Sequence, residues 1–165
     1  MQVRERIDKV LAWVLIILLG ILVLNVLWQV FSRYLMKSPS SFTDELARYL
    51  LIWVGILGAS YASGKKLHLA IDILPSKLKA NKRVVLDRFI YFLVGLFATL
   101  VMVVGGLRLV YITLHLEQTS PALNLPIGYV YLVFPISGIL IVYYCVSDII
   151  RRKRELTEKE EINIS

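Results

Sequence analysis

The sequence predicts an all-α integral membrane protein with four transmembrane helices, because its composition is strongly apolar and it contains four long runs without charge. Hydrophobic residues make up 58% of the 165 residues, and the mean hydropathy is +0.70, well above a soluble domain. A helix needs roughly 20 apolar residues to cross a bilayer. We therefore expect spans over about residues 10–33, 46–63, 87–108 and 126–148.

The membrane domain, residues 1–150, fills nearly the whole chain, and residues 151–165 form a charged tail that we expect to be disordered. The net charge of +7 does not point to nucleic acid, because Lys and Arg are divided by membrane side. With both termini in the cytoplasm, 15 of these residues lie inside and 4 outside, as the positive-inside rule requires. We expect a multi-pass protein with cytoplasmic termini.

The first two predicted helices carry features that call for a helical neighbour. The first begins after a short basic segment, and its apolar run is too long for a cleaved leader, so we interpret it as a retained signal anchor. Near its outer end Asn25, Gln29 and Ser32 share one face, which would contact either the second helix or another subunit. In the second helix Gly55, Ala59 and Ser63 form a row of small residues that lets another helix approach closely.

A charged cluster opens the second helix. Ser41 followed by Asp44 fits a capping box, which places Asp44 and Glu45 in the first turn, where the helix dipole favours negative charge. Arg48 lies within one turn of both carboxylates, so the three can pair on one face. This local explanation does not account for Arg33, at the end of the preceding helix. Arg33, Glu45 and Arg48 could instead form a network that braces two helices or meets a partner, and we favour a partner for Arg33 and Glu45.

Beyond the second helix the chain becomes amphipathic. Residues 65–75 place apolar side chains at helical spacing and set His68 and Asp72 on the polar side, so we expect a short helix in the cytoplasmic interface with a His68/Asp72 pair. The basic residues that follow would contact anionic phospholipid headgroups. In the fourth helix, Pro135 and Gly138 predict a kink or local unwinding.

The sequence contains no enzyme signature. The two histidines, His68 and His115, fall on opposite sides of the membrane, and the single cysteine, Cys145, lies within a span and is expected to be inert packing. We expect neither a catalytic site nor a metal or cofactor in this chain. A free-standing small multidrug exporter would need a carboxylate in mid-membrane, and each predicted span lacks one. An accessory subunit is the favoured interpretation; the exporter and a membrane scaffold unrelated to transport are the alternatives.

Several short motifs also occur in a distinctive order. They are Phe31-Ser32-Arg33-Tyr34, then segments 42–49, 53–59, 68–72, 118–123 and 126–129. Together they resemble the small membrane subunit, called Q, of the tripartite ATP-independent periplasmic (TRAP) transporters, over roughly residues 11–150. Because the individual motifs are short, the resemblance depends on their order and spacing.

The resemblance implies a role in an importer of three parts in a bacterial inner membrane. A periplasmic binding protein (P) captures an organic acid, and a large membrane subunit (M) moves it by an elevator motion driven by Na+, which would bind in that large subunit. The small subunit braces the large one and helps to dock the binding protein. Family substrates include 2-oxo acids, C4-dicarboxylates and sialic acid, and we favour the last two here.

Overall fold

The computed structural model describes residues 2–35, 40–65 and 80–164, with side-chain detail for 3–35, 40–65 and 89–150. Its helices are α1 (Gln2–Tyr34), α2 (Ser41–Gly64), α4 (Ala80–Phe97), the π-helix η2 (Ala98–Gly105), α5 (Gly106–His115), α6 (Ile127–Tyr131) and α7 (Val133–Ile164). Four stretches are long and apolar enough to span a membrane: Val3–Tyr34, Ser41–Gly64, Phe89–His115 and Ile127–Ile150. These stretches confirm the predicted all-α membrane fold. The predicted His68/Asp72 pair lies outside the described residues.

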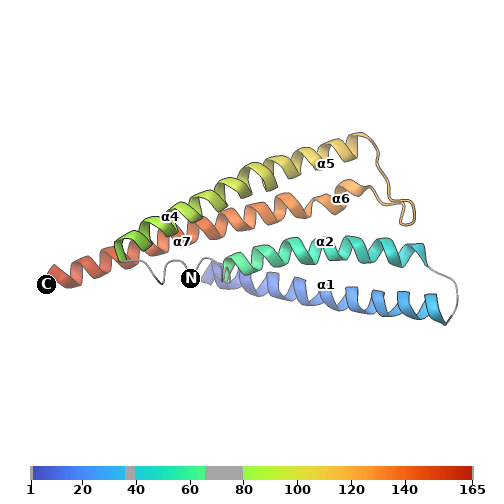
Figure 1. The fold of residues 1–165 in the computed structure, drawn as a ribbon, viewed down its shortest axis with the longest axis horizontal. Helices are drawn as coiled ribbons and strands as arrows, with labels where there is room; N and C mark the ends of the chain where they lie inside the picture. Colours follow the sequence, from blue (N-terminus) through green and yellow to red (C-terminus); the bar gives the residue numbers. More distant parts are fainter. Residues whose placement is uncertain (1, 36–39, 66–79, 165) are drawn as a thin grey trace.

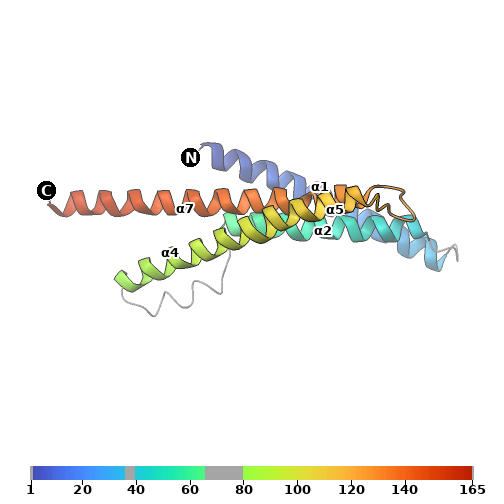
Figure 2. The same cartoon turned by 90° about the horizontal axis from the view of Figure 1, so that it is seen from above.

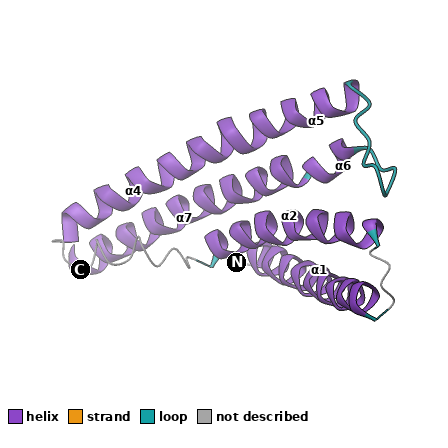
Figure 3. Cartoon of the chain, turned by 45° about the vertical axis from the view of Figure 1, so that its right-hand side comes forward, coloured by secondary structure: helices purple, strands orange, loops and turns teal. Residues whose placement is uncertain are grey.

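The long helices stand side by side in a row. Helix α2 packs between α1 and α7, and α7 in turn packs against the rod formed by α4, η2 and α5 (Figures 1 and 3). The loop between α1 and α2 and the loop between α5 and α6 lie at one end of the row, which we call the loop end. Both termini lie toward the opposite, terminal end. The charge pattern predicts that the terminal end is cytoplasmic.

Two small apolar clusters hold the row together. One joins α1, α2 and α7 through Leu11, Leu57 and Val133, and the other joins η2 and α7 through Ala98, Ile141 and Cys145. The span ending in α7 is the most buried of the four, and the span of α1 is the least. Many other large apolar side chains of the described residues are exposed, where acyl chains or another membrane protein must cover them.

Two helix ends differ from the sequence expectations, and one expected interruption is present. The third span continues to His115 rather than ending near residue 108, and the fourth is interrupted at Leu132, between α6 and α7. The interruption lies close to Pro135, which cannot donate a hydrogen bond to the preceding turn, so the predicted local unwinding is present. The expected disordered tail is wrong for most of its length: α7 continues as helix to Ile164 and runs past the start of α1 (Figure 2).

Helices η2 and α7 approach closely at Gly138. A Cβ atom on Gly138 would lie 2.8 Å from Val103 Cγ2 and 2.9 Å from Met102 Cβ, closer than real Cβ contacts. Only glycine therefore fits here without a shift of the neighbouring helix. The contact fixes the third span against the fourth.

Candidate functional site

The loop end of α2 is organised by a cap one residue earlier than the sequence suggested. Ser40, rather than Ser41, is the N-cap residue, and its side chain accepts a hydrogen bond from the Thr43 backbone N–H. Arg48 then pairs with Asp44, as their spacing predicts, with 2.5 Å between Nη2 and Oδ2. Both side chains are largely exposed, so the pair contributes little to stability by itself.

The polar face of α1 contacts α2 of the same chain. Asn25 Nδ2 donates to the Thr43 carbonyl oxygen at 2.8 Å, and Gln29 Nε2 donates to Asp44 Oδ1 at 2.9 Å. Ser32 is buried and donates to the Gln29 carbonyl within α1. Of the two neighbours that the sequence allowed for this face, the structure places the second helix there.

Glu45 turns away from the arginines and holds a distant loop. The Ser120 hydroxyl donates to Glu45 Oε2, and the backbone N–H groups of Ala122 and Leu123 donate to the same oxygen at 3.1 and 3.3 Å. Glu45 and Ser120 are 75 positions apart in the sequence. The carboxylate therefore joins the start of α2 to the loop between α5 and α6.

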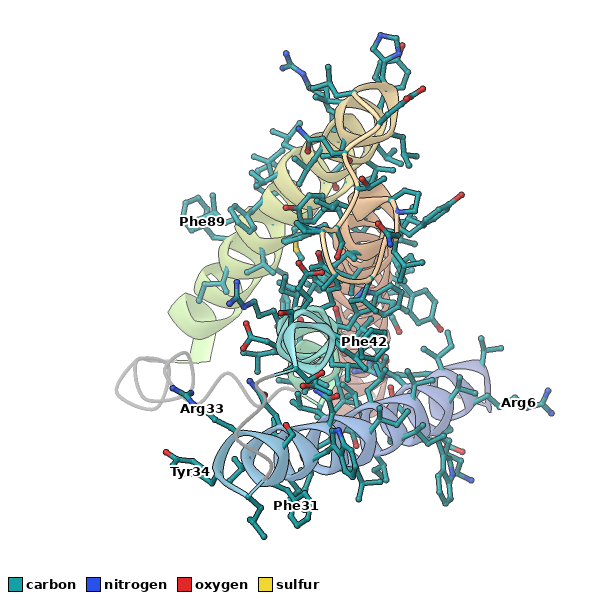
Figure 4. The ribbon with its side chains drawn as sticks, turned by 90° about the vertical axis from the view of Figure 1, so that its right-hand side faces the viewer. Arg6, Phe31, Arg33, Tyr34, Phe42 and Phe89 are labelled. Carbon is teal, nitrogen blue, oxygen red and sulfur yellow. The ribbon has the colours of Figure 1, made fainter. Side chains whose placement is uncertain are left out.

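Arg33 lies exposed at the end of α1, and its side chain projects to one side of the row (Figure 4). Within the part of the chain that the structure describes, it forms no ion pair with Glu45 or with any other carboxylate. The network of Arg33, Glu45 and Arg48 is thus not formed in the structure. Asp44 and Arg48 instead pair with each other, and Arg33 remains available to another molecule.

The described residues leave most of the row of small residues on α2 uncovered. Gly55 and Ala59 are exposed, and a Cβ atom on Gly55 would meet nothing within 4 Å. Ser63 is partly buried. Of the described residues, none covers Gly55, so another helix could approach the row at this position.

A buried serine pair, which sequence reasoning missed, joins the last turn of α2 to the middle of the fourth span. Ser60 and Ser137 are fully buried, and their hydroxyl groups are hydrogen-bonded to each other. Ser137 also donates to the Ile56 carbonyl oxygen at 3.0 Å. Each serine alone is unremarkable in a helix sequence. The signal was that both hydroxyls occur within apolar spans, where a polar side chain needs a protein neighbour.

At the terminal end, Arg4 ties the first helix to two others. Its guanidinium contacts Asp148 Oδ1 at 2.6 Å and donates to the Gly64 carbonyl oxygen at 2.5 Å. It also lies 5.4 Å from the centre of the Tyr144 ring. A Cβ atom on Gly64 would come within 2.6 Å of that ring, so the close approach of α2 and α7 requires glycine.

Asp8, one turn further along α1, completes this arrangement. It accepts a hydrogen bond from the Tyr144 hydroxyl at 2.6 Å and pairs with Lys65 at 3.0 Å. We call Arg4, Asp8, Lys65, Tyr144 and Asp148 the terminal cluster. From the sequence alone, its cations indicate only the membrane topology. The separation of up to 144 positions between its members hid the contacts.

These contacts are structural in kind. Among the residues that the structure describes, no three His, Cys, Asp or Glu side chains gather closely enough to hold a metal ion. Polar contacts instead join α1, α2 and α7 at the terminal end, join the last turn of α2 to the middle of the fourth span, and join α1, α2 and the α5–α6 loop at the loop end. The arrangement can hold four helices in fixed positions and present the uncovered surfaces to partners.

Comparisons with known proteins agree with this picture. The sialic acid TRAP transporter small permease protein SiaQ of Vibrio cholerae is 28% identical over 81% of this chain and 80% of its own length. The C4-dicarboxylate protein DctQ of Rhodobacter capsulatus is 34% identical over 62% of this chain and 44% of its own. The isethionate TRAP transporter permease protein DctMQ of Oleidesulfovibrio alaskensis is 31% identical over 71% of this chain but only 19% of its own.

The family model for the DctQ component of tripartite ATP-independent periplasmic transporters matches residues 22–155. This match covers most of the chain, including α2, the α5–α6 loop and most of α7. It agrees with the motifs that pointed to the same family in the sequence. The chain therefore belongs to the DctQ family, the small permease subunits of TRAP transporters.

Proposed function

We propose that this chain is the non-catalytic small subunit of a sodium-coupled, binding-protein-dependent organic acid importer in a bacterial inner membrane. Its task is to brace the large membrane subunit and to help dock the periplasmic binding protein. The observation that carries this proposal is the way the helices are joined. Polar contacts fix the row at both ends, and a buried serine pair joins the last turn of α2 to the middle of the fourth span, while the broad apolar faces of the described residues remain uncovered.

A fixed row of helices suits a stationary support for a moving neighbour. An elevator-type subunit moves its substrate site across the bilayer and needs a part that does not move. The relative named DctMQ supports the pairing, because this chain matches only 19% of it and the rest of that polypeptide is long enough to be a large permease part. In this chain, the uncovered face of α2 around Gly55 and Ala59 is available to such a subunit.

The substrate is an organic anion. The relatives are named for sialic acid, C4-dicarboxylates and isethionate, which all carry a negative charge at neutral pH. We favour sialic acid or a C4-dicarboxylate, bound by the other two proteins, with Na+ in the large subunit. The carboxylates described within the four helices support an accessory role over a free-standing exporter. They lie near the ends of the apolar spans, and the most buried of them, Asp148, is paired with Arg4.

The test is reconstitution of the chain with the large permease and the binding protein encoded beside it. Proteoliposomes that contain all three should take up sialic acid or succinate when an inward sodium gradient is imposed. Vesicles that lack this chain, the binding protein or the gradient should not. Uptake or drug export by this chain alone, or failure of the two membrane subunits to co-purify, would refute the proposal.

A further inference from the structure

The loop between α5 and α6 is a compact, hydrogen-bonded hairpin. Thr119 and Pro126 form an isolated antiparallel bridge, and the Ile127 N–H donates to the Gln118 carbonyl at 2.9 Å. Across the turn, the Ser120 N–H donates to the Leu125 carbonyl at 2.9 Å. We call residues 118–126 the loop hairpin. Its internal hydrogen bonds give it a defined shape, although it is not part of any helix.

Glu45 fixes this hairpin to the rest of the molecule. Three hydrogen-bond donors of the hairpin, the Ser120 hydroxyl and the N–H groups of Ala122 and Leu123, all reach one atom, Glu45 Oε2. Ser120 is completely buried by this contact. Glu45 lies in the first turn of α2, which Asn25 of α1 also holds through the Thr43 carbonyl. The hairpin is thus tied to α1 and α2 as well as to α5 and α6.

The tip of the hairpin faces outward. Pro121 and Asn124 are exposed, and the Leu125 side chain, although apolar, is 49% exposed. The tip lies beyond the last residue of α5 and before the first of α6, outside the apolar spans, so acyl chains do not cover it. The positive-inside bias places it on the periplasmic side. An ordered polar surface with one exposed apolar side chain suits a soluble protein partner.

We propose that Glu45 is a positioning residue that presents the loop hairpin as a docking surface for the periplasmic binding protein. This inference rests on the proposed function. A loop already held in one shape loses less conformational entropy on binding than a free loop, so the hold should strengthen docking. Glu45 acts through its hydrogen bonds to the hairpin and not as a charge that meets the partner.

The geometry allows these two roles of Glu45 to be separated. Because all three donors converge on Oε2, the carbonyl oxygen of a glutamine, which has two lone pairs, can accept two of these hydrogen bonds without the charge. Glu45→Gln should therefore keep the hairpin in place, and Glu45→Ala should release it. Ser120→Ala removes one donor and should have a smaller effect in the same direction. Asp44→Ala is the matched control, because the Asp44 carboxylate bonds Gln29 and Arg48 rather than the hairpin.

The measurement is binding of the purified binding protein to nanodiscs that hold both membrane subunits, by biolayer interferometry. Glu45→Ala should raise the Kd roughly 3- to 10-fold, the range expected when one or two side chains must be ordered on binding. Glu45→Gln and Asp44→Ala should bind like the wild type. An unchanged Kd for Glu45→Ala in an intact complex would overturn the inference, and so would an equal loss in Glu45→Gln.

A second variant keeps the inference testable if Glu45→Ala prevents assembly. Leu125→Asp changes only the exposed tip and leaves the contacts of Glu45 in place. It should weaken binding while the two membrane subunits still co-purify at wild-type yield, and unchanged binding would overturn the docking surface. If the proposed function itself fails, the result differs: the wild-type subunits do not assemble, or their complex does not bind the binding protein at all.

Discussion

Removing the Arg4 side chain tests whether the terminal cluster holds the helices together. The side chain of Asp148 is only 2% exposed and that of Arg4 18% exposed, so the pair is largely shielded from water. Removing one partner of a fully buried pair costs about 3–5 kcal/mol. The cluster lies at helix ends, where water and headgroups can partly replace Arg4. We therefore expect Arg4→Ala to lower the free energy of unfolding by about 2 kcal/mol.

The assay is thermal unfolding of the purified chain in detergent, with Arg6→Ala as the matched control. Arg6→Ala removes the same charge two residues later in the chain. The Arg6 side chain, however, is exposed and points away from the helices (Figure 4). A loss of about 2 kcal/mol corresponds to a Tm decrease of roughly 4–8 °C for a protein of this size. Arg4→Ala combined with Asp148→Ala should cost less than the sum of the two single changes. A Tm for Arg4→Ala equal to that of Arg6→Ala would refute the reasoning.

Three further predictions follow from the contacts of α1 and α2. Ser60→Ala and Ser137→Ala should each lower the free energy of unfolding by about 1 kcal/mol, and the double variant should lower it little more, because the two hydroxyls are hydrogen-bonded to each other. Additive losses in thermal unfolding would contradict the pairing. Gly55→Leu and Ala59→Leu should leave the Tm of the isolated chain unchanged, because both sites are uncovered. Both should reduce recovery of the complex with the large subunit, and full recovery for both would exclude a packing role. Arg33→Ala should also leave the Tm unchanged while lowering uptake at normal expression, and normal uptake would remove Arg33 from the partner surface.

The features that the sequence predicted well depend on residues close to one another in the chain. Each span is a continuous apolar run, so the four long helices could be read from composition alone. Asp44 and Arg48 pair because they are four residues apart on one helix. The polar face of α1 was also visible, since its members recur at helical spacing. The choice of α2 as its neighbour follows from the short connection between the two helices.

The features that the sequence did not predict join distant residues. Glu45 could pair equally well with Arg48 on its own helix or with a donor elsewhere, and the position of the α5–α6 loop decides the outcome. The terminal cluster was missed for a different reason. Lys and Arg near span ends are expected in any cytoplasmic loop. Their positions therefore indicate the membrane topology but not which carboxylates they pair with. Nothing in the sequence indicated that Gly64 lies against the Tyr144 ring.

The row arrangement has a consequence for how this chain can vary. Helices that stand one layer deep enclose almost no interior, and few side chains are fully buried within the chain itself. At most positions, the residues that can be tolerated should therefore depend on the lipid or partner protein that contacts the row. Substitutions that face lipid should exchange freely among apolar residues, while those on a protein-covered face should change together with the partner. A small subunit of this kind should function poorly when it is paired with the large subunit of a distant relative.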